Sequence, residues 1–166
     1  LFGSYNYESG QITINFADRG NSSTFKKHLK KILWTYRDAP EIIMVHDNVA
    51  YHHAKRIAAW LEKNPRLTLV FLPPYSPELN PIERAWWYMR KKINHNRFLQ
   101  SLKERKIRFW RMFSHFLKPN EELKNINLDK YEAYWLKHIE SKLGIKALAF
   151  HALGTVSFFA EILNEL

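Results

Sequence analysis

The chain has 166 residues, of which 46% are hydrophobic and 15% aromatic, so it can build the core of one domain with at most a small appendage. It contains no cysteine, which excludes disulfide scaffolds, zinc–thiolate sites and cysteine nucleophiles. Its 26 basic and 16 acidic residues give a net charge of +10, which favours a polyanionic partner, either nucleic acid or an anionic membrane surface.

The first part of the chain predicts a hairpin, a helix and a buried strand. Residues 1–7 and 11–16 are short β-prone runs on either side of a turn that contains Gly10, which is the pattern of a hairpin. Residues 24–37 place their apolar side chains on one face of a helix and their lysines outside it. Residues 42–46 contain a continuous apolar run, typical of a strand that is buried on both faces.

The next part repeats the alternation of helix and strand. A helix is expected over 51–63, a second continuous apolar strand over 67–72, and a helix over 80–95 with Asn80 as its N-cap and Pro81 at its first position. The last helix should bury one stripe, made of Ile82, Trp86, Met89 and Ile93. This order predicts an α/β fold in which helices pack on a mixed sheet and strands 42–46 and 67–72 run parallel.

Two carboxylates stand where such a sheet gathers its ligands. Asp47 directly follows the strand at 42–46, and Glu83 lies on the first turn of the helix at 80–95, so both can face one cleft and hold a hard cation such as Mg²⁺. Structural roles are open as well, since Asp47 could cap the next helix and Glu83 could be a capping-box acid. His46 and His52 could be ordinary buried or surface histidines.

The positive charge is concentrated in one stretch. Between residues 84 and 118 there are eleven Lys or Arg and one acid, Glu104, interleaved with aromatic side chains. This pattern favours a surface that contacts phosphates over a merely solvated helix face. The residues expected to contact DNA are Arg84, Arg90, Lys91, Lys92 and Arg97.

The rest of the chain has a different composition. Residues 120–166 carry five Lys and seven acids, so we place a boundary at Pro119 and divide the chain into 1–119 and a C-terminal helical extension, 120–166, without an assigned role. One or two apolar helices are expected over 143–166. The longest uncharged apolar stretch, 147–160, has 14 residues, whereas a bilayer-spanning helix needs about 20, so no membrane partner is expected.

Two blocks of the sequence resemble a known family. HDNVAYH at 46–52 and FLPPYSPELNPIE at 71–83 resemble the DDE transposases of the mariner-like superfamily, in particular the bacterial insertion-sequence branch with its DDE endonuclease domain. The resemblance covers roughly residues 1–118. It implies an RNase H-like fold in which three carboxylates hold two Mg²⁺ (or Mn²⁺) ions. It also implies an enzyme that cuts DNA at transposon ends and joins the freed 3′-hydroxyl to target DNA.

The resemblance also assigns residues and partners. Asp47 matches the second catalytic carboxylate and Glu83 the third. The flanking motif positions are matched by Asn48, His52, Asn80 and Pro81. DNA is the implied partner, a homodimer in a DNA complex is compatible with the family, and the expected location is the cytoplasm, in association with the nucleoid.

The beginning of the chain departs from the family pattern. The first carboxylate of the family lies on a strand upstream of the hairpin, and Asp18 is at the wrong place to replace it. We therefore expect an N-terminally truncated domain whose sheet lacks its first strand, between the hairpin and strand 42–46. The alternatives are a catalytically inactive remnant that only binds DNA through its basic surface, and a generic nucleic-acid-binding α/β module.

Overall fold

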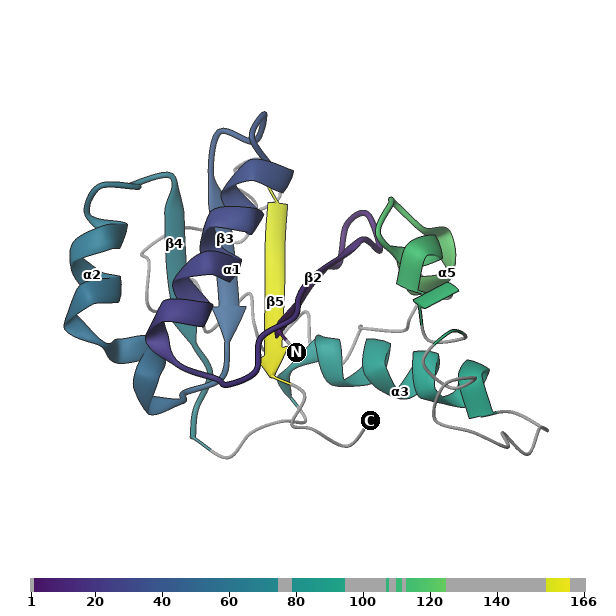
Figure 1. Ribbon diagram of the computed structural model, residues 1–166. Coiled ribbons are helices and arrows are strands. Elements are labelled where there is room, and N and C mark those ends of the chain that lie inside the picture. Colours follow the sequence, from purple (N-terminus) through teal and green to yellow (C-terminus); the bar gives the residue numbers. More distant parts are fainter. Residues whose placement is uncertain are drawn as a thin grey trace.

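The described strands form one five-stranded mixed sheet in the order β2-β1-β5-β3-β4 (Figure 1). The computed structural model describes residues 2–74, 79–94, 107, 110, 111, 113–124 and 155–161, with the backbone alone at 93–94 and 155–161. The strands are β1 (Phe2–Asn6), β2 (Ile12–Asn15), β3 (Ile42–His46), β4 (Leu67–Phe71) and β5 (Thr155–Glu161). The helices are α1 (Ser22–Thr35), the 3₁₀ turn η1 (Ala50–His53), α2 (Lys55–Leu61), α3 (Pro81–Asn94) and α5 (Glu121–Lys124).

The predicted hairpin is confirmed. β1 and β2 pair antiparallel, and the side chain of Asn6 accepts hydrogen bonds from the backbone N–H groups of Glu8 and Ser9, which closes the turn. Gly10 has a φ of 67°, a conformation that side chains with a Cβ rarely adopt. A Cβ there would also lie 2.0 Å from the backbone oxygen of Asn120, so the turn and the start of α5 pack closely because residue 10 is glycine.

The parallel pairing of β3 with β4 is confirmed as well, and helices cover both faces of the sheet. Alternate residues of β3 enter two different cores, as the pleat of a strand requires. Ile42 and Met44 pack with α1 and α2, whereas Ile43 and Val45 pack with α3. The predicted stripe of α3 is buried at its described positions, Ile82, Trp86 and Met89.

The middle of the sheet differs from the prediction. The prediction of one or two helices over 143–166 is wrong for Thr155–Glu161, which form the strand β5. This strand lies between β1, to which it is antiparallel, and β3, to which it is parallel, so the place expected to be empty is filled (Figure 1). β3 is therefore an interior strand of the sheet, but β5 is its middle strand.

The helices agree with the predictions except at one break. α1 begins with a capping box in which the side chains of Asn21 and Thr24 each accept from the other's backbone N–H. The helix predicted over 51–63 is divided, because Ala54 has an extended backbone (ψ 134°) between η1 and α2. That break leaves η1 as a separate turn against β3. In the part of the chain that the structure describes, no helix has the length and apolar character needed to cross a membrane.

A proline in β5 tests its role as the connecting strand. Ser157 pairs with Asn6 of β1 and Met44 of β3. We expect Ser157→Pro to lower the free energy of unfolding by about 3 kcal/mol or more, because proline donates no ladder hydrogen bond and does not fit an interior strand. Urea unfolding followed by circular dichroism measures the change. Ser157→Thr is the matched control and should unfold like the wild type; equal stability of the proline variant would contradict this place for β5.

Candidate metal and DNA site

The two predicted carboxylates come from different elements and meet in one neighbourhood. Asp47 directly follows β3, and Glu83 lies on the first turn of α3. Burial raises the pKa of Glu83, and the charge of Asp47 adds to this rise, so the two carboxylates are near enough to interact. The chain therefore brings together two acids that are 36 positions apart in sequence.

The electrostatics of Glu83 suit a cation. Burial is the main cause that raises the pKa of Glu83; the charge of Arg90 opposes the rise and that of Asp47 adds to it. A half-buried carboxylate beside another carboxylate is destabilised in its ionised form, and a divalent ion between them would offset both effects. The donor set consists of oxygens, which Mg²⁺ and Mn²⁺ accept. Asp47 and Glu83 thus fit the Mg²⁺ or Mn²⁺ ion that the resemblance implies.

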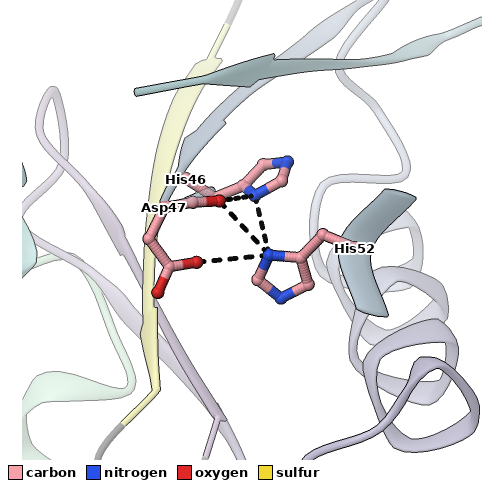
Figure 2. Close-up of side chains that lie close together, drawn as sticks. All are labelled: His46, Asp47 and His52. Atoms are coloured by element: carbon pink, nitrogen blue, oxygen red, sulfur yellow. Dashed lines mark hydrogen bonds and ion pairs between the residues drawn. The ribbon is translucent and has the colours of Figure 1, made fainter. Parts of the chain in front are cut away.

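A histidine pair lies next to Asp47 (Figure 2). His46, the last residue of β3, and His52, in η1, are both buried, and their Nδ1 atoms are 3.1 Å apart. Oδ1 of Asp47 is 3.2 Å from Nδ1 of His52. Burial lowers the pKa of His46 well below its usual value, and His52 adds to the effect, so the His46 ring is neutral. A cluster of His46, Asp47 and His52 was not predicted; the signal in the sequence was a histidine directly before the catalytic-type aspartate.

The flanking motif residues shape the two turns. Asn48 is exposed, and its side-chain oxygen accepts a hydrogen bond from Nε2 of His53. Asn80 is buried, and its backbone oxygen accepts from the N–H of Glu83 at 3.1 Å. Pro81 is the first residue of α3, as predicted. The Asn80–Pro81 turn therefore fixes the start of the helix that carries Glu83.

The basic residues of α3 differ in their surroundings. Arg90, Lys91 and Lys92 are exposed and Arg84 is half-buried. The ammonium group of Lys91 lies 5.1 Å from the ring centre of Trp87, a side chain that is 61% exposed. Lys92 instead forms an ion pair with Glu122 of α5, whose carboxylate also accepts from the hydroxyl of Tyr88, and these contacts raise the pKa of Lys92. Arg97 lies outside the described residues.

Comparisons with known proteins identify the family of the chain. The family described as DDE superfamily endonuclease matches residues 1–106. The chain is 29% identical over 102 residues to the "Insertion element IS630 uncharacterized 39 kDa protein" of Shigella sonnei, covering 61% of this chain and 30% of that protein. It is 31% identical over 80 residues to "Uncharacterized protein y4pE/y4sA" of Sinorhizobium fredii, covering 48% of this chain and 56% of that protein. The chain thus spans about a third and about half the length of these two relatives, and it belongs to the DDE superfamily endonucleases.

Proposed function

We propose that the chain is a fragment of the catalytic domain of an insertion-sequence transposase and that Asp47 and Glu83 hold its divalent cation. The observation that carries the proposal is that Glu83, whose pKa is raised mainly by burial, also feels the charge of Asp47, so the two acids lie in one neighbourhood. When bound, Mg²⁺ or Mn²⁺ supplies activation of water or a 3′-hydroxyl and stabilisation of the leaving oxygen at a phosphodiester. The reaction is DNA strand cleavage followed by transfer of the strand to target DNA.

Each carboxylate has a distinct setting in this role. Asp47 is held at the end of a buried strand with its side chain 37% exposed, so it is accessible to a cation and to DNA. Glu83 is held by the rigid first turn of α3. Because burial raises the pKa of Glu83, protons compete with the cation over a pH range above that of an ordinary glutamate. The nearby guanidinium of Arg90 favours the ionised form of Glu83 and is also exposed to a DNA phosphate.

The proposed partner is DNA, and α3 supplies contacts beside the acids. Arg90 and Lys91 are exposed cations on the helix that carries Glu83. Trp87 adds an exposed aromatic ring next to Lys91. Cations contact phosphates without reading the sequence, and an aromatic ring can stack on an unpaired base. Lys92 contributes less, because Glu122 already neutralises it.

The number of carboxylates favours a second candidate function. Of the three acids that the family resemblance implies, the described residues supply Asp47 and Glu83. A remnant that had lost its metal chemistry would keep the fold and bind DNA through α3 alone. Binding of a cation to the acid pair separates the two candidates, because only the first requires it.

Mn²⁺ binding tests the acid pair. We expect the purified chain to bind Mn²⁺ weakly, to lose it to excess Mg²⁺, and to bind it more than about tenfold more weakly as Glu83→Gln, since one of the ligands is removed. Electron paramagnetic resonance of free Mn²⁺ measures the affinity. Glu62→Gln, which removes an exposed acid at the end of α2, is the matched control and should change nothing. Equal Mn²⁺ affinity in Glu83→Gln would favour the DNA-binding remnant.

Plasmid nicking completes that test. We expect the chain by itself to leave a supercoiled plasmid intact, because two carboxylates do not provide a full ligand set for two ions a few ångströms apart. Metal-dependent nicking that disappears in Asp47→Ala would contradict this expectation and would reveal a third ligand in the chain.

Salt dependence tests the DNA surface. We expect Arg90→Gln combined with Lys91→Gln to lower the slope of log Kd against log salt by about 1–2, because each lost phosphate contact removes about one unit. Gel retardation of a short duplex at increasing salt measures the slope. Lys27→Gln combined with Lys30→Gln removes the same charge from α1, on the opposite face of the sheet, and should leave the slope nearly unchanged. Equal effects of the two double variants would assign the binding to net charge alone.

A further inference from the structure

Three side chains beside the acid pair have the arrangement of metal ligands. Nδ1 of His46 and Nδ1 of His52 are 3.1 Å apart, and Nδ1 of His52 is 3.2 Å from Oδ1 of Asp47. All three ligand atoms lie within 4.8 Å of one another. Figure 2 shows the two imidazoles and one carboxylate oxygen converging, while the second carboxylate oxygen of Asp47 points away from His52.

The protons in this cluster cannot satisfy every contact. Nδ1 of His46 is 2.8 Å from the backbone oxygen of Asp47, and Nδ1 of His52 is 3.3 Å from the same oxygen. Carbonyl and carboxylate oxygens only accept hydrogen bonds, so both Nδ1 atoms must carry a proton. The two N–H groups then face each other at 3.1 Å. If His52 gives up its Nδ1 proton, its lone pair faces the oxygens of Asp47 instead. The first arrangement leaves two N–H donors in contact, and the second leaves a nitrogen lone pair in contact with oxygen lone pairs.

The aspartate oxygen gives an independent indication. Oδ1 of Asp47 is buried and accepts no hydrogen bond of normal geometry from any residue that the structure describes. Its near neighbour is the nitrogen of His52 at 3.2 Å. A buried carboxylate oxygen without a donor is costly unless a cation compensates it.

The dimensions match a small transition-metal ion. Ligands at about 2.0–2.1 Å around a tetrahedral Zn²⁺ lie about 3.3–3.4 Å apart. Two of the separations, 3.1 and 3.2 Å, are close to this edge length, and all three ligand atoms lie within 4.8 Å of one another, so an ion requires a modest movement of the side chains. Two imidazoles and one carboxylate suit Zn²⁺ or Co²⁺, whereas Mg²⁺ prefers an all-oxygen set.

We propose that His46, Asp47 and His52 form a separate site for a transition-metal ion such as Zn²⁺ or Co²⁺, held by the two Nδ1 atoms and Oδ1. The ion accepts the lone pair of each Nδ1, so the single proton of each neutral ring lies on Nε2, and the contact between like groups is removed. The site differs from the acid pair in its residues and in its metal. Asp47 is common to both sites.

Co²⁺ titration of the full chain tests the proposal. We expect visible d–d bands of tetrahedral Co²⁺ that Zn²⁺ abolishes. In His52→Gln the bands should be lost and the Co²⁺ affinity should fall by more than about tenfold, since even outer-shell changes cost that much. His53→Gln is the matched control, because His53 belongs to the same turn, is exposed and bonds to Asn48; its spectrum should match the wild type.

Two further measurements decide the remaining cases. X-ray absorption of the Zn²⁺-loaded wild-type chain should show two imidazole ligands, so the result does not depend on whether His52→Gln folds. Glu83→Gln should keep the Co²⁺ bands while it loses Mn²⁺ affinity, which separates failure of this site from failure of the acid pair. Absence of tetrahedral bands in the wild type, or their survival in a folded His52→Gln variant, would overturn the proposal and leave the histidines as hydrogen-bonded supports of Asp47.

Discussion

The hydrogen bonds of β5 join two pairs of strands, β1 with β2 and β3 with β4, that are not hydrogen-bonded to each other. On one side the strand pairs with β1 of the N-terminal hairpin, and on the other with β3 of the parallel unit. α3 packs against β1 and β5 and also shares a core with β3, and Trp86 of this helix lies so close to Gly3 that a Cβ there would be 2.3 Å from its ring. The position of Glu83 relative to Asp47 therefore depends on β5, although neither acid belongs to it.

The surroundings of Glu83 destabilise its ionised carboxylate when no metal is bound, and they favour the binding of a cation. Glu83 is half-buried, and burial disfavours its charged form before any neighbour is considered. The charge of Asp47 adds to this effect and that of Arg90 opposes it, and the pKa of Glu83 stays raised because burial is the largest of the three causes. A protein that needed only a stable sheet would gain from a neutral residue at either position. Two acids kept at the carboxyl ends of a sheet, on rigid elements, fit a binding role better than a capping role.

Local patterns predicted those parts of the fold that depend on local sequence. The alternation within β3, the capping of α1 and Pro81 at the start of α3 are set by neighbouring residues, and all three are observed. The strand at Thr155–Glu161 could not be predicted, because a short apolar run fits a helix or a strand and the open edges of β1 and β3, far away in sequence, decide between them. The pairing of Asp47 with Glu83 was predicted from the sequence motif and from the topology of the sheet. The histidine cluster was not predicted, since a lone histidine before an aspartate is most often a core residue.

The shared aspartate makes the two proposed metal sites interdependent. With both sites empty, a cation approaching the acid pair meets two negative charges, Asp47 and Glu83. A divalent ion already held by His46, His52 and Oδ1 of Asp47 balances those two negative charges. The repulsion between the acids is then relieved, but the attraction for a second cation is weaker. Thermodynamic linkage makes the effect mutual: a cation at the acid pair weakens the histidine site by the same factor. A transition metal at His46 and His52 would therefore act against Mg²⁺ at Glu83, and Asp47 is the residue through which the two ions compete.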